Sequence, residues 1–140
     1  MRGARRAVAA AAAAAGTAAL ALVPAGPAGA QGVPSGQSLV LWEALWERVE
    51  GDAAPQAVLR FLAPGIAPGG GVAPEAALAD LAWLCETHGL PMAALPYAPT
   101  GTVVITLMDR PVPRGTTDPE ATQYFGLFAL EDGACVPADL

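Results

Sequence analysis

The stretch TVVITLM, Thr102 to Met108, is the segment that most strongly predicts the fold. It is rich in β-branched side chains, which favour strands, and it is apolar on both faces. A strand with two apolar faces is buried on both sides, so it takes a central position in a sheet. Downstream, Thr122 to Leu130 (TQYFGLFAL) predicts a second strand, and Glu131-Asp132-Gly133 predicts a hairpin turn into a short strand through Cys135.

Upstream of this strand, the sequence predicts one main helix. Pro74 is typical of a first helical position, and Gly89 followed by Pro91 is typical of a helix end. Asp80 and Glu86 are expected to point away from the core. The face expected to be buried consists of Leu78, Leu81, Cys85 and His88. One helix among several strands indicates an α+β fold.

The segment Ser38 to Glu50 (SLVLWEALWERVE) is ambiguous. A helical period places Trp42, Leu45, Trp46 and Val49 on one apolar stripe, whereas an alternating period suits a strand. Periodicity alone slightly favours the helix. The next segment, Ala57 to Ala63, suits a short strand that ends at Pro64.

The first thirty residues have the pattern of a secretory signal peptide. Met1 to Arg6 carries three arginines, Ala7 to Val23 is almost wholly apolar, and Ala28-Gly29-Ala30 provides the small residues of a cleavage site. We therefore predict a signal peptide at 1–30, cleavage between Ala30 and Gln31, and a single domain at 31–140 in the periplasm or outside the cell. Twin-arginine export and an uncleaved membrane anchor are less favoured alternatives.

The composition excludes several classes of function. Residues 31–140 carry four arginines against thirteen acidic residues, a formal charge of −9. Such a domain repels nucleic acid and anionic membranes, so we expect neither as a partner after cleavage. The chain contains no lysine, which excludes Schiff-base chemistry, and His88 is its only histidine. We expect no cofactor and no metal.

Cys85 and Cys135 are the only cysteines and, in an exported protein, predict a disulfide. The alternative is that Cys85 and His88, one helical turn apart, form half of a metal site. Four ligands would then require two carboxylates from elsewhere, and nothing in the spacing indicates them.

Polar residues cluster where the two downstream strands would meet. If these strands pair antiparallel, their polar ends lie at one end of the sheet, and the carboxylates of Asp109 and Glu120 flank Arg110. Such a pair could bind a polar ligand or hydrolyse one by acid–base catalysis, although ion pairing that fixes the strand end is the favoured role. The candidate binding residues are Asp109, Arg110, Glu120, Thr122, Gln123 and Tyr124.

Trp42 and Trp46 form a second candidate site. Core packing is the favoured role for this pair, and an exposed aromatic platform for a partner is the alternative.

Two motifs carry a resemblance to a known family. PEATQYF, Pro119 to Phe125, and EDGAC, Glu131 to Cys135, follow VITLMDRPV from Val104 to Val112. Together they resemble a family of small exported bacterial proteins of unknown function, over most of the mature chain. The resemblance implies a hairpin for Ser38 to Ala63, and thus a small antiparallel sheet with one main helix, approximately β-β-α-β-β. In that family an acidic residue often follows the aromatic pair that corresponds to Tyr124 and Phe125, whereas this chain has Gly126 there.

These observations predict an exported, disulfide-bonded domain that binds a protein or a small ligand and is not an enzyme. One alternative is a small hydrolase that uses Asp109 and Glu120. The other is an envelope interaction protein that uses Trp42 and Trp46. The sequence names neither the ligand nor the oligomeric state.

Overall fold

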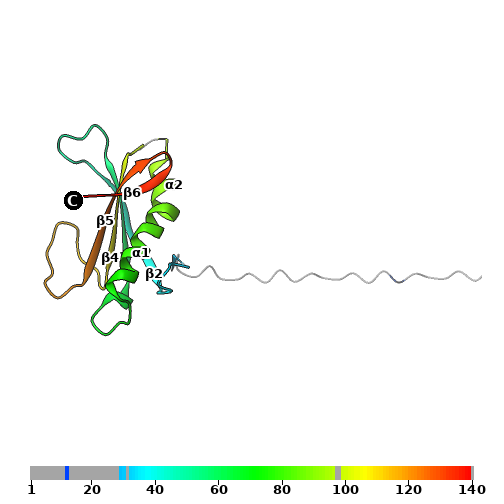
Figure 1. Ribbon diagram of the computed structural model, residues 1–140, viewed down its shortest axis with the longest axis vertical. Helices are drawn as coiled ribbons and strands as arrows, with labels where there is room; N and C mark the ends of the chain where they lie inside the picture. Colours follow the sequence, from blue (N-terminus) through cyan, green and yellow to red (C-terminus); the bar gives the residue numbers. More distant parts are fainter. Residues whose placement is uncertain (1–11, 13–28, 31, 97–98, 140) are drawn as a thin grey trace, which may run out of the picture.

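The computed structural model describes residues 12, 29–30, 32–96 and 99–139. A six-stranded sheet forms one layer, and the helices cover one of its faces (Figure 1). The strands are β1 (Gly29–Ala30), β2 (Leu39–Glu47), β3 (Gln56–Leu62), β4 (Thr102–Met108), β5 (Gln123–Glu131) and β6 (Ala134–Ala138). The helical segments are η1 (Pro64–Ile66), α1 (Pro74–Leu84), the π-helical turn η2 (Cys85–Gly89) and α2 (Leu90–Ala93). The predicted α+β fold is confirmed.

The order and direction of the strands differ from the prediction. Neighbours in the sheet follow chain order, β1 to β6, and every pair is antiparallel except β3 and β4, which run parallel. The predicted antiparallel sheet is therefore wrong at its centre, and the observed order is β-β-β-α-α-β-β-β rather than β-β-α-β-β. The physical reason is the helical connection, which returns the chain to the end of the sheet where β3 began.

Strands β2 and β3 form the hairpin that the family resemblance implied for Ser38 to Ala63. Their pairing runs from Val40 opposite Leu62 to Glu47 opposite Gln56, with a β-bulge between Leu41 and Glu43. The helical interpretation favoured by periodicity is wrong, because tertiary pairing decides between two patterns that the local sequence supports about equally.

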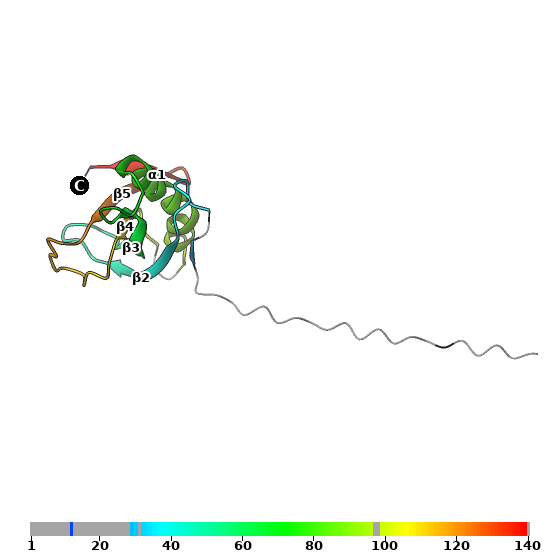
Figure 2. The same cartoon turned by 90° about the horizontal axis from the view of Figure 1, so that it is seen from below.

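Strand β4 is buried on both faces, as its sequence predicts. Val103, Ile105 and Leu107 face the helices and are fully buried, while Thr106 and Met108 on the opposite face are also fully buried. A fully buried Val, Leu, Ile or Met side chain contributes about 1.5–3 kcal/mol. In Figure 2 the strands from β5 to β2 form a curved layer beneath α1, and β4 lies at its centre.

A buried arginine holds in place the loop that covers the sheet on the face away from the helices. Arg60 of β3 is 3% exposed and donates hydrogen bonds to Glu43 Oε2 of β2 (2.7 Å) and to the carbonyl oxygen of Val112 in the β4–β5 loop. It also contacts Met108 Sδ at 3.1 Å. Val112 is 2% exposed, so this part of the loop packs against the sheet on the face away from the helices.

A second ion pair connects the same loop to the far end of β2. Arg114 of the loop donates a hydrogen bond to Glu47 Oε2. This hydrogen bond from Arg114 holds the pKa of Glu47 below its ordinary value. The two arginines therefore attach the loop to two neighbouring strands.

Helix α1 turns a different face to the core than predicted. Leu78 is 54% exposed, whereas Asp80 is fully buried beside Leu81 and Leu84. The predicted burial of Leu78 and exposure of Asp80 are both wrong. Alanine-rich helices carry little contrast between faces, so a partner for the carboxylate decides which face is buried.

The helical region also continues beyond its predicted end. Gly89 does not terminate it: the chain passes through the π-helical turn η2 into α2, with Pro91 in the first turn of α2. A Cβ atom on Gly89 would lie 2.8 Å from a methyl group of Val103. This glycine is required for close packing of the helices on β4.

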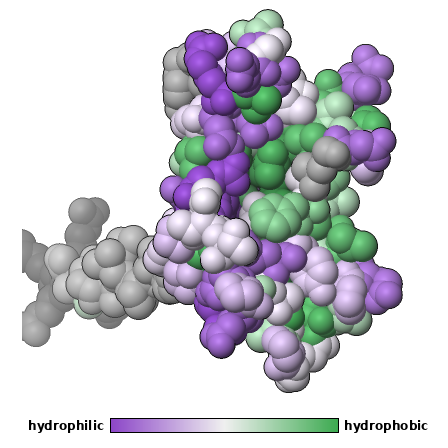
Figure 3. Space-filling model, turned by 90° about the vertical axis from the view of Figure 1, so that its left-hand side faces the viewer, coloured by the Kyte–Doolittle hydropathy of each residue, from purple (hydrophilic) through white to green (hydrophobic). Residues whose placement is uncertain are grey.

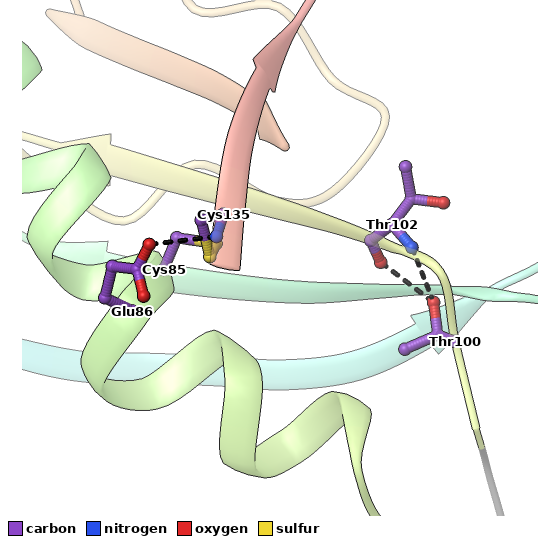
Figure 4. The surroundings of a disulfide bond; sticks show 5 residues. All are labelled: Cys85, Glu86, Thr100, Thr102 and Cys135. Atoms are coloured by element: carbon purple, nitrogen blue, oxygen red, sulfur yellow. Dashed lines mark hydrogen bonds between the residues drawn. A yellow bond between two sulfur atoms is a disulfide. The ribbon is translucent and has the colours of Figure 1, made fainter. Parts of the chain in front are cut away.

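Cys85 and Cys135 form the predicted disulfide. It joins η2 to the start of β6 with the Cα atoms 6.2 Å apart (Figure 4). Beside it, Glu86 Oε1 accepts a hydrogen bond from the Cys135 backbone N–H at 2.9 Å. Near the start of β4, Thr100 Oγ1 accepts a hydrogen bond from the Thr102 N–H at 3.2 Å. The helical layer and the edge strand are therefore covalently linked.

Most of the predicted signal peptide at 1–30, and Gln31 after it, lies outside the described residues. Of this region, Gly29 and Ala30 are described and pair with Val40 and Leu39 of β2. Within the described parts of the chain, no helix has the length and apolarity needed to cross a membrane.

We expect the disulfide to contribute a large share of the stability. The chain-entropy model assigns about 4 kcal/mol to a bond across this sequence separation of 50 residues. Replacing both Cys85 and Cys135 by alanine should lower the free energy of unfolding in urea by up to about that amount. The double variant should no longer respond to reductant, whereas the wild type should. Equal wild-type stability with and without reductant would contradict a structural role for the bond.

Candidate functional site

The polar residues at the ends of β4 and β5 come together as the antiparallel pairing requires. The Asp109 N–H donates to the Thr122 carbonyl oxygen at 3.0 Å, which joins the two strand ends. The Asp109 side chain is 1% exposed, and Arg110 donates to both of its oxygens, at 3.1 and 3.2 Å. These hydrogen bonds to the Asp109 carboxylate raise the pKa of Arg110 above its ordinary value. Both carboxylate oxygens of Asp109 are thus hydrogen-bonded to Arg110.

Glu120 lies at the periphery of this cluster. Its side chain is 84% exposed, and its Oε2 is 4.0 Å from Arg110 Nη1. Its own N–H donates to Asp118 Oδ1 at 3.0 Å, so the turn before it is held by Asp118. A surface contact of this kind contributes little to stability.

The other three candidate residues do not converge on one point. Gln123 and Tyr124 are successive residues of β5, so their side chains lie on opposite faces of the sheet. Tyr124 packs partly against the core on the helix side. Thr122 and Tyr124 line a shallow hollow of about 550 Å³ against the glycine-rich loop at 66–74. The predicted six-residue set therefore divides between a salt-bridged strand end and the two faces of β5.

This arrangement favours a structural role for the cluster. Acid–base catalysis by a pair of carboxylates needs both of them at the reacting atoms. Asp109 is buried with both oxygens bonded to Arg110, and Glu120 is in solvent.

Trp42 and Trp46 do not form one aromatic face. Trp42 is 51% exposed, whereas Trp46 is half-buried and packs against the core. A regular strand would place residues four apart on the same face, but the bulge between Leu41 and Glu43 interrupts the alternation. Trp42 instead continues an exposed apolar run with Val40 and Leu41 at the start of β2.

The half metal site considered for Cys85 and His88 is not formed, because Cys85 is bonded to Cys135. His88 lies among aromatic rings, with Phe61 and Trp83 centroids each 6.0 Å away. Among the described residues, no group of three or more metal-binding side chains occurs.

Sequence reasoning missed the buried carboxylate of Asp80. It accepts hydrogen bonds from the Ser35 N–H (2.8 Å), from Ser35 Oγ (2.5 Å) and from Gln37 Nε2 (2.7 Å). These bonds fasten the segment before β2 to α1. Ser35 and Gln37 are two nearby donors in the polar segment before β2, but nothing local connects them to a helix more than forty residues away.

Sequence reasoning also missed a groove of about 360 Å³ where α1 meets β5 and the end of β6. Of the residues that line it, Asp139 carries the only charge. Leu78 and Phe125, at 54% and 46% exposed, are among the most exposed large apolar side chains of the described chain. The lining consists of Leu78, Leu81, Ala82, Phe125, Gly126, Leu127, Phe128, Pro137, Ala138 and Asp139.

Apolar side chains also gather on the side of the molecule opposite the helices, across its centre and between polar regions above and below (Figure 3). Phe125 lies on this face of β5, because it alternates with Gly126 and Phe128, which face the helices. Val136 of β6 lies opposite Ala129 on the same face and is 37% exposed. The groove therefore adjoins apolar surface on both sides of the sheet.

The fold and these surfaces define a small disulfide-bonded α+β domain with an apolar surface groove. The chain belongs to the family of unknown function DUF6497, which matches residues 7–140. No curated protein and no solved structure matches the chain.

The two candidate carboxylates provide a matched test. Asp109→Asn should lower the free energy of unfolding by about 1 kcal/mol, because a buried ion-paired acceptor loses its charge. Glu120→Gln, which affects an exposed side chain beside the same arginine, should change it by less than about 0.5 kcal/mol. Urea unfolding monitored by tryptophan fluorescence measures both. If neither substitution changes stability, Asp109 would be available for ligand chemistry and the structural role would be wrong.

Proposed function

We propose that this chain is an exported domain that binds a segment of another protein through the groove between α1 and β5, and that it acts by binding rather than by catalysis. The observation that carries the proposal is the exposure of Leu78 and Phe125 beside this groove. Large apolar side chains gathered at a concave surface are typical of recognition sites.

Export is supported by two independent features. One is the signal-like sequence at 1–30, with its small residues before Gln31. The other is the disulfide, since such bonds persist in the periplasm and outside the cell but are rare in the cytosol. Cleavage after Ala30 would also remove β1 and leave β2 as the edge of the sheet.

A second surface is a candidate for the same class of function. Val40, Leu41 and Trp42 are 40–51% exposed at the start of β2, which favours part of the envelope-interaction alternative. The bulge beside this surface discourages strand pairing. The hydrolase alternative has less support, because the oxygens of Asp109 are bonded to Arg110.

Export is tested by the mass of the protein recovered from the envelope of its host. We expect a chain that begins at Gln31 and lacks two hydrogens, because Cys85 and Cys135 are oxidised. The matched control is Ala30→Arg, which should block cleavage and retain residues 1–30. A full-length, reduced wild-type chain in the cytoplasm would contradict the proposal.

Binding at the groove is tested with Nile red, an uncharged dye that fluoresces in apolar surroundings. The native oxidised domain should bind it saturably, and Leu78→Gln should weaken the affinity about tenfold by making the groove wall polar. Trp42→Gln is the matched control and should leave the affinity unchanged. Loss of binding in the Trp42 variant alone would assign the function to the β2 surface, and absence of saturable binding would contradict both surfaces.

A further inference from the structure

One stretch of β5 has no strand partner on its outer side. Strand β6 pairs with β5 only from Leu127 to Glu131, whereas β5 begins at Gln123. From Gln123 to Gly126, β5 pairs with β4 on one side, and no described strand lies on the other. The groove lies at this position, because its lining includes Gly126 of β5 and Pro137 at the end of β6.

The other edges of the sheet carry features that discourage strand addition. The exposed strand β2 contains a bulge and the charged side chains of Glu43 and Glu47. Strand β6 contains Pro137, which lacks a backbone donor. Bulges, charges and proline are the usual means by which natural sheets prevent edge pairing. The stretch Gln123 to Gly126 has none of these features.

Gly126 leaves room for the Phe128 ring at the floor of the groove. A Cβ atom at this position would lie 2.6 Å from the Phe128 ring and 3.4 Å from Leu81 Cβ. A larger residue would therefore displace the ring or fill the groove.

The charge around the groove selects the occupant. The described chain carries thirteen acidic residues and four arginines, and none of the arginines lines the groove. Asp139 lines it, and Glu75 precedes Leu78 by one helical turn on the exposed side of α1. This acidic rim disfavours a second copy of the same chain and an anionic lipid surface, and it favours a basic partner.

We propose that the groove binds an extended protein segment that adds to the free edge of β5 and carries apolar residues flanked by lysine or arginine. Successive side chains of a strand point to opposite faces, so one apolar residue contacts Leu78 and Ala82 while the next contacts Phe125. Backbone hydrogen bonds to residues 123–126 fix its register. This inference rests on the proposed function and specifies its partner.

The probe for this inference is a blocked synthetic peptide with Val-Ile-Val at its centre and lysines at both ends. A second peptide, the acidic twin, carries glutamates in place of the lysines. A third is the basic peptide N-methylated on alternate central amides. We expect the basic peptide to bind, the acidic twin to bind about tenfold more weakly, and N-methylation to abolish binding. In hydrogen exchange, alternate amides from Gln123 to Gly126 should become protected, and Leu78→Gln should weaken binding whereas Trp42→Gln should not.

The possible outcomes separate this inference from the proposed function. Saturable Nile red binding without binding of the basic peptide would overturn the inference and leave the groove as a site for another apolar ligand. Equal binding of the basic and acidic peptides would overturn the charge argument, and unchanged binding after N-methylation would overturn strand addition. Binding of the domain to phosphatidylglycerol vesicles would assign the surface to a membrane instead.

Discussion

Burial of both faces of β4 is the constraint on which the rest of the structure depends. Its helix-side residues are covered by α1 and η2. On the other face, Thr106 and Met108 are fully buried beside Arg60, which holds the β4–β5 loop through Val112. A two-layer domain ordinarily leaves one face of its sheet to solvent. Here the long loop substitutes for a third layer, so its attachment to the sheet matters as much as the packing of the helices.

Two buried charged side chains fasten these coverings through hydrogen bonds to neighbouring groups. Arg60 holds the loop through Val112 and pairs with Glu43, while Asp80 holds the segment before β2 through Ser35 and Gln37. An unpaired charge in either position would be strongly destabilising, so both networks specify one arrangement of chain segments. Polar groups in this domain therefore determine which segments cover the core, and apolar burial supplies most of the energy.

The elements that sequence reasoning predicted are those decided by local pattern. The stretch from Thr102 to Met108 is apolar on both faces whatever surrounds it, and two cysteines can pair in one way. The errors arise where a distant segment decides the outcome. Asp80 is buried because Ser35 and Gln37 reach it, and Gly89 lies inside a helical region because Val103 packs against it. Similarly, Asp109 and Glu120 meet at one sheet end as expected, but only the fold distinguishes the buried carboxylate from the exposed one.

The ion pairs within the fold also determine the net charge of the surface that a partner meets. Arg60, Arg110 and Arg114 are each bonded to a carboxylate of their own chain. Of the four arginines in the described residues, Arg48 is the one with no described ion pair, and it lies beyond the end of β2 rather than among the groove residues. The remaining acidic residues, Asp139 among them, outnumber it several-fold. Because most of the arginines form ion pairs within the fold, the charge left on the surface for recognition is negative. An apolar groove in such a surface discriminates between partner segments by the charge of the residues that flank the apolar residues of each segment.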